Sequence, residues 1–312
     1  MDNFNRETTV YLIVLFTAGA LWGLSMPLMQ IAVSEGYRHL GLIFWQMVIM
    51  ALLFGLVQIV RGKSVPLSRP ALWVYLVIAL LGSLLPATAL YEAARHLPAG
   101  LLSILIAFVP LITFPMAILA RTDEFDWKRF GGLVFGLFGV AMIVLPESSL
   151  PDPAKAIFVL LALIGSFFYA CEANYVAKWG TAGLDPVEVI LGSSVIGIVI
   201  VGPAAMWSGD FIDPRTTWNA PEYALVILSL VSGIAYAGYV WLISKAGAVF
   251  AAQAGYLITG FGVLWSIVLL SETYSIWVWG ALVVVMAGVF LVQPRQEHTL
   301  AQTEESDQTP FL

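Results

Sequence analysis

The chain has 312 residues, of which 60% are hydrophobic and 11% charged, and its mean hydropathy is +0.90. This composition excludes an ordinary soluble domain, because such domains carry about a quarter charged residues. The net charge of −6 comes partly from acidic residues near the C-terminus, so it indicates little about partners. A single cysteine, Cys171, and three scattered histidines exclude an internal disulfide and a Cys/His metal cluster.

Long apolar runs alternate with short polar breaks along the chain, which is typical of a polytopic membrane protein. Residues 1–9 form a polar leader, and residues 294–312 predict a disordered, cytoplasmic tail. The first apolar run is too long for a cleaved signal, and further runs follow at once. Ten spans are predicted, at about residues 10–33, 41–60, 71–94, 98–120, 128–146, 156–177, 187–207, 221–244, 248–270 and 275–293.

The sequence contains one unit twice. The stretch from Ala99 to Val144 recurs from Ala248 to Gln293 at a constant offset of 149 positions, which aligns the acidic Asp123 with Glu272. A shared offset over such a length indicates an internal repeat. The predicted copies are residues 10–146 and 156–293, joined by a linker at residues 147–155.

Each copy holds five spans, an odd number, so the second copy enters the membrane in the opposite orientation to the first. The predicted fold class is therefore an all-α polytopic membrane protein, with ten transmembrane helices arranged as two inverted five-helix repeats. With the N-terminus inside, ten Lys and Arg residues face the cytoplasm and four face outward. This positive-inside bias predicts that both termini are cytoplasmic.

Over residues 10–293 the sequence resembles the EamA-type, ten-helix branch of the drug/metabolite transporter superfamily. The resemblance is carried by ALWGLSMPLMQIAV (Ala20–Val33), the segment Leu90–Ala99, Pro110 followed by Asp123, Gly131 and Gly139, and LLSETYSIWVWGALVVVMAGVFL (Leu269–Leu291). Two positions depart from the family pattern: Gln46 replaces a frequent basic residue, and Thr259 is the counterpart of Pro110. The resemblance implies outward transport by alternating access, around a cavity lined by spans one, three, four, six, eight and nine.

Glu172 is the leading candidate for a functional side chain, because an ionisable residue inside a span is costly and tends to face a cavity. It lies in GSFFYACEANYVAKW (Gly165–Trp179), with Tyr169 and Tyr175 on neighbouring turns. A carboxylate beside aromatic rings suits a cationic or zwitterionic amine through charge pairing and cation–π contact. One alternative is that Glu172 carries a coupling proton, and another is a structural pair with Lys178.

The other candidates are aromatic or amide side chains on spans one, six, eight and nine. Such residues also pack against neighbouring helices, so packing is the alternative for each of them. Glu92 is expected to pair locally with Arg95 and His96. The predicted substrate-binding set is Trp22, Tyr169, Glu172, Asn174, Tyr175, Tyr236, Tyr239, Gln253 and Tyr256.

The sequence contains no phosphate-binding glycine loop, nucleophile elbow, HExxH motif or EF-hand loop, so we predict no enzyme, no cofactor and no metal. The prediction is a secondary transporter, an exporter of an amine-bearing metabolite or drug such as an amino acid or a quaternary ammonium compound. Its partners would be this small molecule and the lipid bilayer of a bacterial inner membrane, without nucleic acid, for a monomer or a homodimer.

Two alternatives to this function stay open. The cargo could be an anionic or neutral metabolite such as an organic acid, a flavin or a nucleoside, or the chain could be a non-transporting membrane scaffold. Under alternating access, hinges are expected where the backbone is free, at Pro27, Pro86, Pro110, Gly255, Gly260 and Gly262.

Overall fold

The computed structural model describes residues 2–145, 153–246, 250–251 and 253–292, and this part of the chain is all-helical. Within these described residues, eight helical segments are long and apolar enough to cross a membrane, and two shorter apolar helices bring the set to ten. The elements are α1 (Asp2–Gly23), α2 (Ser25–Ala32), α3 (His39–Val60), α4 (Arg69–Ile78), η1 (Ala79–Leu84), α5 (Leu85–Ala94), α6 (Ala99–Ile106), α7 (Val109–Ala120), α8 (Trp127–Val144), η2 (Pro153–Lys155), α9 (Ala156–Trp179), α10 (Pro186–Ser208), α11 (Ala220–Ala246), α13 (Ala254–Leu270) and α14 (Ile276–Leu291).

The ten spans lie close to their predicted positions, with two differences at the ends. The polar leader is not a separate segment, because α1 begins at Asp2 and runs through it. The ninth span was expected from residue 248, but α13 begins at Ala254, since apolar composition alone does not distinguish a helix from the turn before it. The predicted linker falls largely on residues 146–152 and the tail on residues 293–312, which lie outside the described residues.

Two spans of the first copy are broken one turn before a proline. A proline has no N–H, and its ring clashes with the carbonyl group four residues earlier. The helix α1 ends at Gly23, four residues before Pro27, and α6 ends at Ile106, four residues before Pro110. These breaks divide spans one and four into two helices each.

The third span carries a different irregularity. Here α4 and α5 are joined by the π-helical turn η1, and Pro86 follows this turn at the start of α5. The corresponding helices of the second copy, α9 and α11, have no proline beyond the first turn and run unbroken. The helix α13 is also continuous through the glycines at which hinges were predicted, Gly255, Gly260 and Gly262. The two copies therefore share a fold but differ in backbone regularity.

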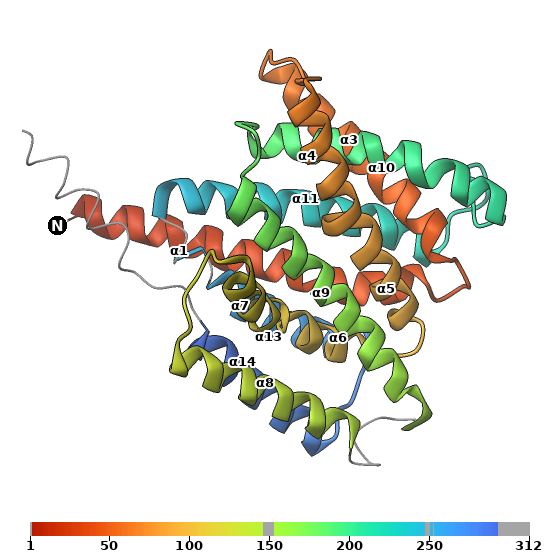
Figure 1. Cartoon of the computed structure of the whole chain (residues 1–312). Helices are drawn as coiled ribbons and strands as arrows, with labels where there is room; N and C mark the ends of the chain where they lie inside the picture. Colours follow the sequence, from red (N-terminus) through yellow and green to blue (C-terminus); the bar gives the residue numbers. More distant parts are fainter. Residues whose placement is uncertain (1, 146–152, 247–249, 252, 293–312) are drawn as a thin grey trace, which may run out of the picture.

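Corresponding spans of the two copies pack against each other. The helix α3 lies against α10, and α8 lies against α14. These pairs form opposite sides of the bundle in Figure 1, and α1, α5, α6, α9, α11 and α13 lie between them. At the contact between α8 and α14, a Cβ atom on Gly132 would lie 2.5 Å from the carbonyl oxygen of Gly288. Small residues allow this close approach, which is how helices typically associate in membranes.

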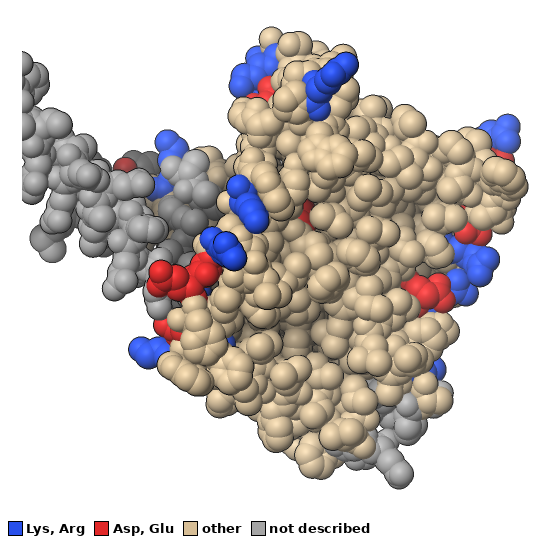
Figure 2. All heavy atoms as spheres, viewed as in Figure 1, with Lys and Arg blue, Asp and Glu red and all other residues tan. Residues whose placement is uncertain are grey.

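Charged side chains gather towards opposite ends of the bundle and leave a broad uncharged surface between them (Figure 2). One end, which we call the Arg61 face, comprises the connections at residues 61–68, 121–126 and 180–185. The other end, the Arg95 face, comprises the connections at residues 33–38, 95–98, 209–219 and 271–275. Large apolar side chains such as Leu52, Phe138 and Val199 are exposed between the two faces. In a bilayer this surface faces lipid.

Candidate functional site

Glu172 lies inside the membrane-length helix α9. Its side chain is partly buried, and among the described residues its carboxylate accepts no hydrogen bond and pairs with no cation. Lys178, the alternative partner suggested by the sequence, instead places its ammonium group 5.0 Å from the centroid of the Trp179 ring. Glu172 is therefore an ionisable side chain at membrane depth, where charge is costly, with no partner among the described residues.

The carboxylate of Glu172 rests on the π-helical turn η1. A Cβ atom added to Gly82 would lie 2.5 Å from the carboxyl carbon and from Oε1 of Glu172, and 2.6 Å from Oε2. Only glycine leaves room for the carboxylate there. Turns of this kind inside α-helices occur frequently at functional sites, because they displace backbone groups from the regular hydrogen-bond ladder.

An aromatic cluster contributed by three helices lies beside this carboxylate. The ring of Trp22 meets those of Tyr236 and Tyr239 edge to face, with centroids 6.3 and 5.7 Å apart. Glu172 lies close enough to Tyr169 and Tyr236 to interact electrostatically with the hydroxyl groups of both. The structure thus brings five of the nine predicted residues together from α1, α9 and α11. We call these five residues the central site.

Two other predicted residues on α9 point elsewhere. The side-chain amide of Asn174 donates hydrogen bonds to the backbone carbonyl groups of Thr113, at 3.2 Å, and Ala170, at 2.9 Å. Asn174 is buried, and it joins α9 to α7. The ring of Tyr175 packs on the exposed Trp179 at the end of the helix, with centroids 5.3 Å apart. The positions of both residues favour packing over cavity lining.

The last two predicted residues lie at the start of α13. Gln253 occupies the turn before this helix, and its N–H donates to the carbonyl group of Phe250 at 3.1 Å. Tyr256 is partly buried and packs against the main hydrophobic core.

Sequence reasoning missed a polar extension of the site. Tyr91 is fully buried, and its hydroxyl group donates to Oε1 of Gln46 at 3.0 Å. Tyr91 is also the electrostatic neighbour of Tyr169. The sequence offered one indication of this extension, because Gln46 stands where the family pattern often has a basic residue. This polar line connects α3 and α5 to Tyr169.

A pocket of about 220 Å³ on the Arg61 face reaches one member of the central site. It lies between α3, α10 and α11, and its lining includes Arg61, Asp185 and Tyr236. Arg61, from the first copy, donates two hydrogen bonds to Asp185, from the second copy, at 2.6 and 3.1 Å, and Lys63 adds a third at 3.1 Å. The hydrogen bonds from Arg61 hold the pKa of Asp185 well below its usual range. An ion pair between the copies therefore flanks a route to Tyr236.

Comparison with known proteins decides the family. Residues 9–145 and residues 156–293 each match the EamA-like transporter family. The chain belongs to this family. It is a multi-pass membrane protein built from a tandem of EamA units, so the predicted family, the all-α class and the ten spans are confirmed.

Two relatives of the EamA chain span almost its whole length. "Uncharacterized transporter YvbV" of Bacillus subtilis (strain 168) is 25% identical over 282 residues, which cover 89% of each chain. "Uncharacterized inner membrane transporter YedA" of Escherichia coli (strain K12) is 27% identical over 287 residues, again 89% of each. A solved crystal structure superposes with a TM-score of 0.60 at 16% identity, covering 95% of this chain and 99% of the other, which shows the shared fold.

Proposed function

We propose that this EamA protein is a secondary transporter that exports a small amine-bearing molecule, an amino acid or a quaternary ammonium compound. The observation that carries the proposal is the unpaired carboxylate of Glu172 in an aromatic setting. An ionised carboxylate in a medium of low dielectric constant requires a partner. The cationic group of the cargo supplies this partner in the loaded state.

The aromatic rings support a cationic cargo. A cation over a Trp or Tyr ring gains about 0.5–2 kcal/mol, depending on how far it is desolvated. Trp22, Tyr236 and Tyr239 form a cluster of such rings from α1 and α11, and the charge of Glu172 extends to Tyr236. An amine would therefore contact the carboxylate and the rings together. In the unloaded state a proton would take its place, which would couple transport to protons.

Alternating access supplies the mechanism that we propose. The pocket between α3, α10 and α11 is the route from the Arg61 face, and the Arg61–Asp185 ion pair would open and close with it. The breaks before Pro27 and Pro110 are the expected bending points of spans one and four. The positive-inside bias supports an orientation with the Arg61 face and both termini in the cytoplasm, in a bacterial inner membrane.

Ligand binding to the purified protein tests the assignment. The measurement is thermal stabilisation by choline and by its neutral carbon isostere, because a ligand that binds the folded state raises its melting temperature. We expect choline, or another amine of a wider panel, to raise the melting temperature of the wild type. The neutral isostere of the same amine should leave the melting temperature unchanged. We also expect Glu172→Gln to lose the effect and the exposed-loop control Glu124→Gln to keep it.

Two outcomes would contradict the proposal. Stabilisation by organic anions or neutral nucleosides instead of amines would overturn the amine class, while family membership would still hold. Amine binding that survives Glu172→Gln would remove Glu172 from the site. Counterflow of a bound amine in proteoliposomes would then separate a transporter from a scaffold, because a scaffold binds ligand without exchanging it across the bilayer.

A further inference from the structure

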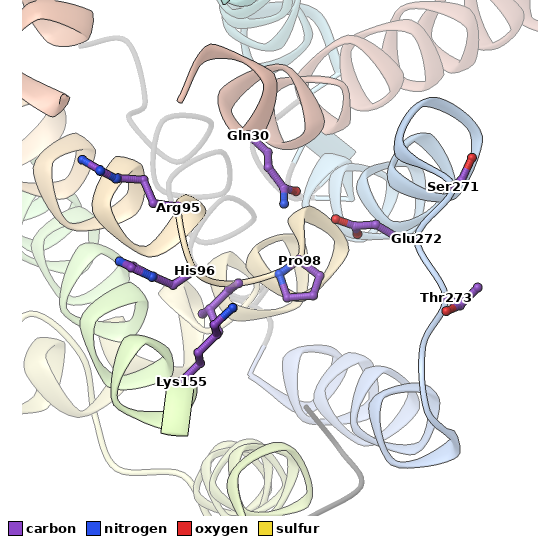
Figure 3. A pocket seen from close by; sticks show the side chains of 9 residues that line it. Gln30, Arg95, His96, Pro98, Lys155, Ser271, Glu272 and Thr273 are labelled. Carbon is purple, nitrogen blue, oxygen red and sulfur yellow. The ribbon is translucent and has the colours of Figure 1, made fainter. Parts of the chain in front are cut away.

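A second pocket opens on the Arg95 face, at the opposite end of the bundle from the Arg61–Asp185 ion pair. Its volume is about 420 Å³, within the range of about 300–1,000 Å³ that is common for small-molecule sites. It lies between the end of span one, the corner between α5 and α6, the start of α9 and the connection from α13 to α14 (Figure 3). No residue of the central site lines it.

One side of this pocket carries a cation, Lys155. Lys155 is partly buried at the start of α9 and has no hydrogen-bond or ion-pair partner in the described part of the chain. The neighbouring Arg95 and His96 are less available, because both pair with Glu92, at 3.8 and 3.6 Å. This confirms the local pairing expected for Glu92. In Figure 3 the side chain of Lys155 rises towards Pro98, whereas the ends of Arg95 and His96 point the other way.

The other side of the pocket consists of hydrogen-bond acceptors. Oε1 of Gln30 is buried and has no hydrogen-bond partner in the described part of the chain. Glu272 is held rigidly, because its carboxylate accepts the N–H groups of Ala99, at 2.7 Å, and Gly100, at 3.1 Å, and the hydroxyl group of Tyr274. The ends of Gln30 and Glu272 point towards a common space in Figure 3.

Tyr274 acts as a neutral hydrogen-bond donor to Glu272. Burial, together with the hydrogen bond to Glu272, holds the pKa of Tyr274 well above its usual range, so Tyr274 remains a neutral donor. A carboxylate has about four lone-pair directions, and three donors leave room for another. The pocket therefore presents an ammonium group on one side and unfilled acceptors on the other.

We propose that this pocket is a vestibule site that binds a zwitterion, with the carboxylate of the ligand on Lys155 and its ammonium group on Gln30 and Glu272. Because the acceptors require N–H donors, a primary ammonium group fits and a quaternary one does not. The proposal deepens the proposed function, on which it rests, since it selects zwitterionic primary amines within the amine class.

The vestibule lies on the same helical face as the central site. Gln30 follows Met26 by four residues, and Met26 follows Trp22 by four. Because Leu24, between α1 and α2, keeps right-handed helical dihedral angles, the three side chains occupy one face of span one. Eight residues of helix correspond to about 12 Å along the axis. Met26 is 8% exposed and lies between the two sites, so they occupy one line through the bundle with a closed segment between them.

Binding assays with matched ligands test the vestibule directly. The probes are the standard α-amino acids, straight-chain amino acids from glycine to aminohexanoate, and the amide of each, which lacks the carboxylate. We expect at least one zwitterion to bind the wild type about tenfold or more tightly than its amide. We expect Lys155→Met to remove this preference and Lys155→Arg to keep it. Lys128→Met, at an exposed position at the start of α8, should leave the preference unchanged.

The acceptor side has its own test. Gln30→Leu should weaken binding of the zwitterion and of its amide alike, because both carry the primary ammonium group. Full trimethylation of the ligand nitrogen should abolish vestibule binding in the wild type. A panel in which no zwitterion outperforms its amide, or a preference that survives Lys155→Met, would overturn the vestibule.

The Glu172→Gln variant separates the two proposals. If Glu172→Gln abolishes amine binding and Lys155→Met changes nothing, the central site stands and the vestibule falls. If Lys155→Met removes the preference for zwitterions and Glu172→Gln changes neither binding nor exchange, the vestibule stands and the central assignment falls.

Discussion

Replacing Gly82 with alanine tests the central site without touching Glu172. The added Cβ atom would lie 2.5 Å from the carboxyl carbon of Glu172. Non-bonded carbon atoms settle at about 3.5–4.0 Å, so either the carboxylate moves away by about 1 Å or the turn η1 shifts. In both cases the carboxylate leaves the position that it holds against the π-helical turn.

The expected cost to ligand binding follows from this displacement. A hydrogen bond to a charged group contributes about 1.5–3 kcal/mol, and each 1.4 kcal/mol corresponds to about a tenfold change in affinity. If the amine contact is lost when the carboxylate moves, Gly82→Ala should weaken amine binding by about 10- to 100-fold. The helix itself should tolerate the change, because alanine is favoured over glycine in a helix interior by about 0.5–1 kcal/mol.

Titration of the purified variant with the amine that binds the wild type measures the effect. The matched control is Gly131→Ala in α8, where an added Cβ atom would meet nothing within 4 Å. The control should bind like the wild type, with an unchanged or slightly raised melting temperature. Wild-type affinity in a folded Gly82→Ala protein would refute the assignment of Glu172 as the amine contact.

Three further predictions concern stability. Asp185→Ala should lower the melting temperature by several degrees, because it removes two stabilising interactions. Asp185 caps α10 by accepting N–H groups of its first turn, which contributes about 1 kcal/mol. Its ion pair with Arg61 contributes up to about 1 kcal/mol. Asp185→Asn keeps the cap and removes only the ion pair, so it should lower the melting temperature less than Asp185→Ala. Equal decreases for the two variants would contradict the assignment of stability to both cap and ion pair. Because the pKa of Asp185 is depressed in the folded state, its stabilising contribution is full above about pH 4, the unfolded value, and declines as the pH falls below it. The gap in melting temperature between wild type and Asp185→Asn should therefore narrow in acid, and a gap that widens there would be inconsistent with the sign. Gly132→Leu should reduce expression and thermal stability far more than Gly131→Ala, because the leucine side chain would meet the backbone of Gly288. Fluorescence size-exclusion chromatography would show whether the Gly132→Leu protein still folds.

Much of the fold could be predicted from the sequence, because the determining signals are local. Apolar runs set the spans, since the bilayer demands continuous hydrophobic length and internally satisfied backbone. The constant offset between Ala99 and Ala248 defined the two copies. The breaks in spans one and four lie four residues before Pro27 and Pro110, whose rings clash with the carbonyl group at that position.

The site could be predicted only in part, because composition does not fix which way a side chain faces. Glu172 and Asn174 are two residues apart on one helix, yet Asn174 packs towards α7 while Glu172 lies against η1. Tyr236 and Tyr239 were suggested by their spacing, but only the contact with Trp22 shows that they face the interior.

The sequence by itself determined that this chain crosses the membrane ten times as two related units, because hydrophobic length and repetition are properties of the chain alone. Only the tertiary structure decided the partners. It placed Gly82 under Glu172, Arg61 against Asp185, and Lys155 across a pocket from Gln30. Each of these pairs joins residues far apart in sequence, and helix packing in three dimensions, which no local pattern encodes, brings them together.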